Sequence, residues 1–255
     1  MPSFIIHSIV GRELCKKLKF SDEDSKKFFI ANLLPDIKQN VYADNLSDQE
    51  IRKLIQKEKR VTHFRNNEQD ILEYPDLDLF LKTYGKLIED LTVFGYFFHL
   101  YTDFYYFSVF LPKIIIFLDK EYKETSKKEN NCFIKIIKTN EIITVENFWS
   151  KKNPKGIYHD YSALNKYLID KYSFNFNYQD ILSFFNSSLF VNKIEEIDIK
   201  NFPLLLKDLK MFYEEAEDDN SSFNIFSTDE VDLLINNIII SFIENYSYLF
   251  SKFLK

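Results

Sequence analysis

A histidine and an aspartate four residues apart are the side chains of this sequence best placed to do chemistry. His99 and Asp103 lie within its most apolar stretch, residues 93–118. In a helix, residues at positions i and i+4 lie on one face about a turn apart, so the imidazole and the carboxylate would be neighbours. A carboxylate buried on an apolar helix needs an ion-pair partner, hydrogen bonds or a metal ion. The pair is therefore a candidate for metal ligation.

Three more residues of ligand type precede this pair. His7 lies on an apolar stripe of the first segment, His63 follows a threonine, and Asp36 comes directly after the proline that ends a helical segment. The five residues together make three imidazoles and two carboxylates, the mixed set of N and O ligands that zinc, manganese or iron accepts. Each has an ordinary alternative when taken singly, because a lone histidine on an apolar face is commonly a satisfied core residue and an aspartate often caps a turn.

Two of the four glycines occur beside these candidates at helical spacing. Gly11 follows His7 by four residues, and Gly95 precedes His99 by four. A glycine inside a helix costs about 1 kcal/mol relative to alanine, so its presence needs a reason. One reason is the close approach of helix backbones, which would bring ligands on separate helices together. Ordinary close packing is the other.

The composition favours helices as the elements that position the candidates. Four glycines in 255 residues are too few for a turn-rich β-sandwich or a dinucleotide-binding fold. Apolar spacing and capping residues predict helices over residues 2–18, 21–34, 48–57, 75–90, 92–110, 161–172, 178–185, 202–216 and 227–253. Ser227 and Glu230 form a capping box at the start of the last helix. The 92–110 helix either ends there or continues past a kink at Pro112 to residue 120.

The rest of the chain predicts linkers and one small β element. Residues 120–131 read as a solvated linker and residues 218–222 as an exposed acidic loop. Residues 133–138 and 142–145 flank a short turn, which predicts either a β-hairpin or a short helix.

These elements predict a mostly α-helical fold with a small hairpin. We expect a helical metal-binding body over residues 1–120 and a helical accessory portion over residues 121–255, packed together as one compact unit. Cys15 and Cys132, far apart in the chain, are no disulfide framework.

Charge and hydropathy exclude further classes. A net charge of −6 spread along the chain argues against a protein that binds duplex DNA. No basic segment followed by an apolar segment opens the chain as in a secretory signal. Residues 93–118 contain His99 and Asp103, which a membrane span would have to bury in lipid. We therefore expect a soluble, cytoplasmic protein and not an integral membrane protein.

The candidate residues lie in short motifs that resemble, in order and spacing, the zinc-dependent phospholipase C family, which is related to the S1/P1-type nucleases. The motifs are Phe4-Ile5-Ile6-His7, Leu33-Leu34-Pro35-Asp36, Thr62-His63-Phe64 and the segment from Gly95 to Asp103. The resemblance covers about the first 110 residues. The second half is similar to accessory regions of uncharacterised bacterial members of this family.

The resemblance implies a multi-helix bundle and a set of metal ligands. Asp36, His63 and His99 would hold one ion, and Asp103 would bridge to a second ion held partly by His7. Secreted members use a processed N-terminal Trp as a further ligand and have two more His and a Glu for a third ion. Here no residue of ligand type follows Asp103 before Asp119. The resemblance therefore implies one or two ions, zinc first, with manganese or iron as alternatives.

The activity implied is metal-dependent phosphoester hydrolysis by a metal-activated water, as in a phosphodiesterase or phospholipase C. Asp36 and Asp103 are the candidate catalytic carboxylates. Arg65 could bind the phosphate with two hydrogen bonds, although a solvated surface position is the common alternative. His159 and Asp160 form the doublet of HD-type phosphohydrolases, but no later histidine completes that pattern, so we place them at a helix start.

Two other classes remain open at this stage. A catalytically reduced protein of the same fold could bind a protein partner, with its metal structural or lost. A membrane protein would depend on the aromatic run of residues 93–118. The substrate class cannot be read from the sequence, because the many Phe and Tyr residues could stack bases, hold acyl chains or fill the core.

Overall fold

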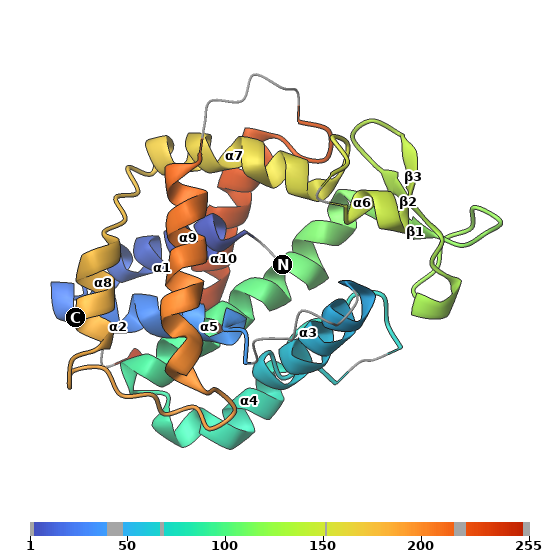
Figure 1. The fold of residues 1–255 in the computed structure, drawn as a ribbon. Helices are drawn as coiled ribbons and strands as arrows, with labels where there is room; N and C mark the ends of the chain where they lie inside the picture. Colours follow the sequence, from blue (N-terminus) through green and yellow to red (C-terminus); the bar gives the residue numbers. More distant parts are fainter. Residues whose placement is uncertain (1–2, 40–47, 67–68, 151, 217–222, 252–255) are drawn as a thin grey trace.

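Helices make up most of the protein, as the sequence predicts. The computed structural model describes residues 3–39, 48–66, 69–150, 152–216 and 223–251 (Figure 1). Within these residues the helices are α1 Phe4–Lys17, α2 Asp22–Leu33, α3 Asp48–Thr62, α4 Leu77–Tyr84, α5 Leu91–Tyr105, α6 Val145–Phe148, α7 Ile157–Lys171, α8 Tyr178–Phe185, α9 Phe202–Glu214 and α10 Thr228–Tyr246. The strands are β1 Ile115–Leu118, β2 Phe133–Ile136 and β3 Ile142–Thr144.

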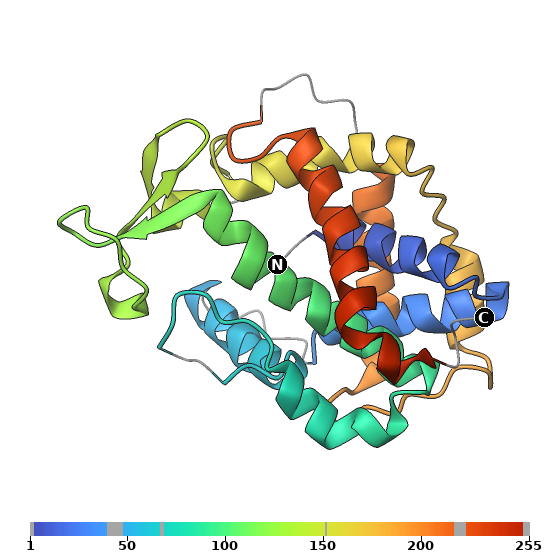
Figure 2. The ribbon, with the colours of Figure 1, turned by 180° about the vertical axis from the view of Figure 1, so that it is seen from behind.

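The helix that carries His99 and Asp103 runs through the middle of the molecule. Every residue of α5 from Leu91 to Asp103 is buried. Helix α2 packs along one side of α5, and α10 crosses it, as the view from behind shows (Figure 2). Because α5 has no exposed face over this length, its polar side chains must find their partners inside the protein.

The close approach predicted from the glycines is confirmed. A Cβ atom at Gly95 would lie 2.6 Å from the Phe28 carbonyl oxygen and 2.8 Å from the Ala31 Cβ. A Cβ atom at Gly11 would lie 2.9 Å from the Asn32 side-chain nitrogen. At Gly95 the backbone of α5 therefore approaches the backbone of α2 more closely than a residue with a Cβ atom would allow, whereas at Gly11 the close neighbour is the side chain of Asn32.

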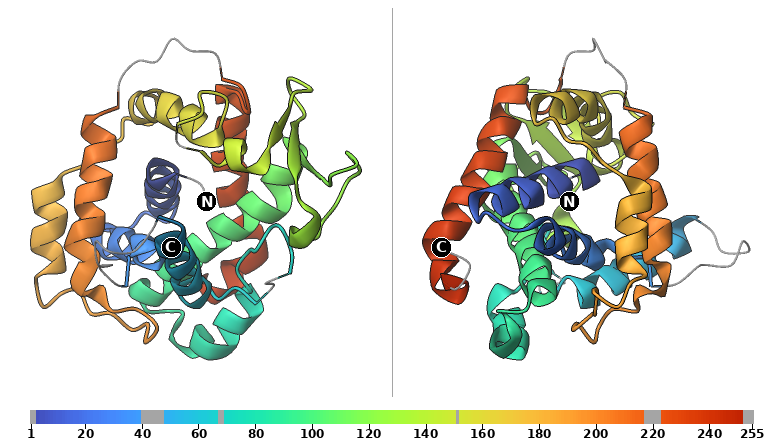
Figure 3. Two further views of the ribbon diagram at one scale, coloured as in Figure 1. Left: turned by 45° about the vertical axis from the view of Figure 1, so that its right-hand side comes forward. Right: turned by 90° about the vertical axis from the view of Figure 1, so that its left-hand side faces the viewer.

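Helices from the second half of the chain pack around α1, α2 and α5. Helix α1 lies between α9 and α10 and also contacts α7, while α8 packs on α2 (Figure 3). Apolar side chains from both halves belong to one hydrophobic core. Among the described residues, no helix combines the length and the apolar character that crossing a membrane requires.

The predicted β-hairpin is confirmed, and it belongs to a larger sheet. Strands β2 and β3 pair antiparallel, and β1 adds to the other edge of β2, with Ile115 opposite Ile136. This strand excludes the alternative in which the α5 helix continues past Pro112 to residue 120. After Tyr105 the chain makes a π-helical turn, Tyr106–Phe110, and then a 3-10 turn, Leu111–Lys113. Pro112 has no N–H to continue the helix, and the apolar run beyond it pairs with β2 instead.

Several helix bounds also differ from prediction. Helix α3 runs on to Thr62, and α7 begins at Ile157. Helix α4 ends early, because the chain tightens into the 3-10 turn Gly85–Leu87 before Asp90 caps α5. Helix α10 begins at the predicted capping box, with Ser227 as its N-cap, but it ends at Tyr246. The acidic loop at residues 218–222 and the end of the last predicted helix at residue 253 lie outside the described residues.

Candidate metal centre

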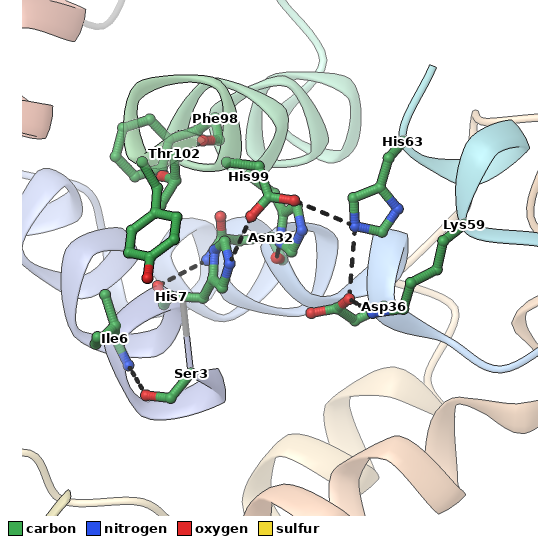
Figure 4. A network of polar contacts seen from close by, with 12 residues as sticks. Ser3, Ile6, His7, Asn32, Asp36, Lys59, His63, Phe98, His99 and Thr102 are labelled. Atoms are coloured by element: carbon green, nitrogen blue, oxygen red, sulfur yellow. Dashed lines mark hydrogen bonds and ion pairs between the residues drawn. The ribbon is translucent and has the colours of Figure 1, made fainter. Parts of the chain in front are cut away.

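The structure brings the five candidate residues together from four parts of the chain. Figure 4 shows His7, Asp36, His63 and His99 at this place. His7 comes from α1, and Asp36 from the 3-10 turn Leu34–Asp36 that follows α2. His63 follows the last residue of α3, while His99 and Asp103 come from α5. The side chains of all five are almost completely buried, with an exposed fraction of 1% at Asp36 and 0% at His7, His63 and Asp103.

Asp103 lies between two of the imidazoles. Its Oδ1 is 3.3 Å from His7 Nε2, and its Oδ2 is 3.5 Å from His63 Nε2. His63 Nε2 is also 3.5 Å from Asp36 Oδ1. The two carboxylates therefore share His63 as a neighbour.

His99 connects the two ends of this cluster. Its ring stacks on that of His7, with centroids 4.0 Å apart, and the His63 ring meets it edge-on at 5.3 Å. Two groups of three could each hold a metal ion: His7, His99 and Asp103 form one, and Asp36, His63 and His99 form the other. In each group one donor atom per residue lies within 4.8 Å of the others.

His63 and His99 each make a hydrogen bond through Nδ1, which leaves the Nε2 atom of each ring unpaired and facing the centre. His99 Nδ1 is 2.8 Å from the carbonyl oxygen of Asn32, which can only accept, so Nδ1 carries the proton. His63 Nδ1 is 2.9 Å from the hydroxyl of Thr62, whose own proton goes to the Pro35 carbonyl oxygen. Each neutral ring therefore presents the lone pair of Nε2, and neither Nε2 has a hydrogen-bond partner.

Such lone pairs fit a cation. An unpaired buried polar atom is costly, and here the bare Nε2 of His63 faces two carboxylate oxygens, so acceptors face acceptors. A backbone carbonyl or hydroxyl behind a histidine is also the usual way in which metal-ligating imidazoles are oriented. The donor set, the tautomers and the unpartnered atoms thus all suit a divalent metal ion.

The protonation states of the ligand side chains also suit a divalent metal ion. Burial lowers the pKa of His63 to about 4, and burial together with the neighbouring His7 brings the pKa of His99 well below its ordinary value. Burial by itself would raise the pKa of both carboxyls. The ammonium of Lys59 nevertheless holds the pKa of Asp36 well below its ordinary value, and the contact with His7 lowers the pKa of Asp103. At neutral pH the rings of His63 and His99 are neutral and the carboxylates ionised, as metal ligation requires.

Two basic side chains contact the carboxylates from the solvent side. Lys59 Nζ lies 2.9 Å from Asp36 Oδ1, and Arg65 Nη2 donates to Asp103 Oδ2 at 3.1 Å. Their exposed fractions are 26% and 13%, against 1% or less for their partners. Arg65 also lies over the Phe107 ring. The structure thus places Arg65 at the site and not on the open surface, while its role in substrate binding stays a prediction.

His159 and Asp160 lie in the first turn of α7, as predicted, and Asp160 supports the fold there. The buried Asp160 carboxylate accepts hydrogen bonds from the backbone N–H groups of Asn224, Ile225 and Phe226. These bonds anchor the segment that leads into α10. Neither residue belongs to the groups that could hold a metal among the residues that the structure describes.

Sequence reasoning missed Lys59, Thr62 and Asn32, the residues that support the ligands. Asn32 also donates to the carbonyl oxygen of His7 at 2.9 Å and so joins α2 to α1. One signal was available, since Asn32 is a lone amide in an otherwise apolar run at the end of α2. Lys59 carries no comparable signal, because it lies in a helix rich in charged residues.

The fold and the site together define an α-helical protein with a buried His/Asp centre that could hold a metal ion. No family model matches the chain, and no curated protein or solved structure matches it.

Proposed function

We propose that the protein is a metal-dependent phosphoester hydrolase, a phosphodiesterase or an enzyme like phospholipase C. The observation that carries the proposal is the buried centre itself, in which three imidazoles and two ionised carboxylates converge and both His63 and His99 present a bare Nε2. The ordered motifs that resemble the zinc-dependent phospholipase C family support the same reaction class.

The ligands divide into two groups around His99. Asp36, His63 and His99 would hold one ion, and Asp103 with His7 would hold a second, so we propose one or two zinc ions, with manganese or iron as alternatives. A bound divalent metal ion lowers the pKa of a water molecule toward neutrality and supplies positive charge near the phosphoryl oxygens.

Side chains of the protein would take up the proton and bind the phosphoryl group. Asp36 Oδ2 has no hydrogen-bond partner, so this oxygen is free to take the proton of the attacking water. Asp103 Oδ2 accepts a hydrogen bond from Arg65, and its Oδ1 lies 3.3 Å from His7 Nε2 without a hydrogen bond, so the carboxylate faces both sides of the centre, which suits a bridging ligand. Arg65 keeps an unpartnered, buried Nε–H beside the site and would donate it to a phosphoryl oxygen.

Hydrolysis of bis-p-nitrophenyl phosphate by protein purified without chelator tests the proposal. We expect metal to copurify and hydrolysis to stop on chelation and return when the metal is restored. Metal-loaded protein that hydrolyses neither this diester nor p-nitrophenyl phosphate would contradict it.

The burial of the ligands favours a second candidate, a catalytically reduced protein of the same fold that binds a protein partner and keeps a structural ion. All five ligand side chains have exposed fractions of 1% or less, as in a closed structural centre. In that case metal would raise the melting temperature by stabilising the native state, and no hydrolysis would accompany it.

A further inference from the structure

Two buried tyrosine hydroxyls meet where α5 ends. Tyr106 begins the π-helical turn that follows α5, and Tyr161 lies on α7 in the second half of the chain. The Tyr161 hydroxyl donates a hydrogen bond to the Tyr106 hydroxyl, and the two residues are 6% and 0% exposed. Two hydroxyls bring two protons, and the bond between them uses one. Within the described residues, the proton on Tyr106 has no acceptor.

Tyr106 lies on the same side of α5 as the ligand Asp103. The backbone N–H of Tyr106 donates to the carbonyl oxygen of Asp103, so the two residues belong to one helical turn. Residues three apart are neighbours on a helix face, and long side chains of a helix point back toward its N-terminus, here over the turn that holds Asp103. Burial raises the pKa of the Tyr106 phenol well above its ordinary value, and the negative charge of Asp103 adds to this effect. The phenol is therefore a protonated donor at neutral pH.

Two ligands of the centre have unpaired acceptor atoms in this region. Asp103 Oδ1 and His7 Nε2 lie 3.3 Å apart, and neither has a hydrogen-bond partner. An unpaired buried polar atom is costly. A metal ion alone would pair with the acceptors, but the Tyr106 proton needs an acceptor oxygen, which a phosphate group supplies.

Arg65 and Tyr106 are neighbours of the same aromatic ring. The Arg65 guanidinium lies 5.5 Å from the centroid of Phe107, and the Tyr106 ring meets Phe107 edge-on with centroids 5.2 Å apart. Arg65 also contacts Asp103 through the oxygen that His7 does not face. π-Helical turns are rare and occur mostly at functional sites, and this one carries both Tyr106 and Phe107. A tetrahedral phosphate has enough oxygens to accept from Arg65 and Tyr106 and still contact a metal ion.

We propose that the Tyr106 hydroxyl is a further phosphate-binding group, which donates its proton in a hydrogen bond to an oxygen of the phosphoester, and that Tyr161 is the residue that positions this hydroxyl. The inference rests on the proposed hydrolase function and deepens it. By donating to Tyr106, Tyr161 fixes the direction of the remaining O–H bond and strengthens it as a donor. The second half of the chain thereby takes part in the site without supplying a metal ligand.

Titration calorimetry of zinc-loaded protein with inorganic phosphate tests the proposal. Tyr106→Phe loses only the hydroxyl, and its affinity for phosphate should fall about tenfold or more, the usual effect of losing a hydrogen bond to a charged group. Tyr161→Phe should weaken binding less, and the double variant should bind no more weakly than Tyr106→Phe, because Tyr161 acts only through Tyr106. Tyr101→Phe is the matched control. Tyr101 is a buried tyrosine of α5 whose hydroxyl donates to Ser241, and its variant should bind phosphate as the wild type does.

Zinc content and circular dichroism of each variant separate the ways in which the proposal can fail. A Tyr106→Phe variant that folds, holds zinc and binds phosphate as the wild type does would overturn the role of Tyr106 and leave the proposed hydrolase standing. If Tyr106→Phe does not fold, Tyr161→Phe decides: weaker phosphate binding at wild-type zinc content supports the proposal, and unchanged binding overturns it. A wild type that takes up no metal, or takes up zinc and binds no phosphate, would overturn both this inference and the proposed function.

Discussion

At the scale of single residues, the centre depends on groups behind the ligands. The Thr62 hydroxyl decides which nitrogen of His63 carries the proton, because it gives its own proton to Pro35 and so must accept one from His63. The Asn32 carbonyl does the same for His99. The ligand residues themselves could be predicted from motif and spacing. The supporting contacts of Thr62 and Asn32 could not be predicted, because they depend on how separate helices pack together.

Replacing Thr62 with valine should weaken metal binding without unfolding the protein. The variant keeps the side-chain shape but lets the His63 ring change tautomer or rotate, and loss of such a support typically lowers metal affinity about 10- to 100-fold. Competition with a chelator of known affinity measures the change. Thr83→Val is the control, because Thr83 is exposed and bonds only within its own helix to Leu79. Equal metal affinity in both variants would show that the Thr62 hydroxyl does not orient the ligand.

At the scale of elements, the contact between α2 and α5 positions most of the site. Asn32 and Asp36 lie in and just after α2, and His99 and Asp103 lie on α5. The sequence predicted both helices, and the glycine spacing predicted their close approach. It did not predict β1, because a short apolar run pairs as a strand or continues a helix according to partners elsewhere in the chain.

Gly95→Ala should destabilise the fold. The added Cβ would lie 2.6 Å from the Phe28 carbonyl oxygen, so α2 and α5 must separate. Overpacking of this kind costs about 1–3 kcal/mol, against a gain of about 1 kcal/mol in helix propensity. Gly85→Ala is the matched control, since its nearest neighbouring atom is 4.0 Å away. Urea denaturation measures both variants, and a Gly95→Ala variant as stable as the wild type would refute the close contact.

At the scale of the whole molecule, helices from both halves of the chain form one core around α1, α2 and α5. The predicted mostly α-helical fold is confirmed, and the range predicted for α8, residues 178–185, agrees with the structure at both ends. How the second half surrounds the first could not be predicted, because contacts between distant helices leave no periodic pattern in either one.

The two cysteines report on this packing. Cys15 is buried in α1, and burial raises the pKa of its thiol well above the ordinary value, whereas Cys132 is exposed. The reactive species is the thiolate, so we expect a thiol reagent such as Ellman's reagent to modify one cysteine per native chain quickly. The second should react only as the protein unfolds in urea. Rapid reaction of both in native protein would show that α1 is not enclosed by the later helices.

The central claim is that the five His and Asp side chains hold metal, and elemental analysis of purified protein tests it most directly. Protein prepared without chelator should contain one or two equivalents of a divalent transition metal per chain, zinc first. His99 belongs to both candidate ligand groups, so His99→Ala should lose most of this metal while keeping a helical circular dichroism spectrum. Wild-type protein that holds less than a tenth of an equivalent after incubation with zinc, manganese and iron, or a folded His99→Ala variant with undiminished metal, would contradict the claim.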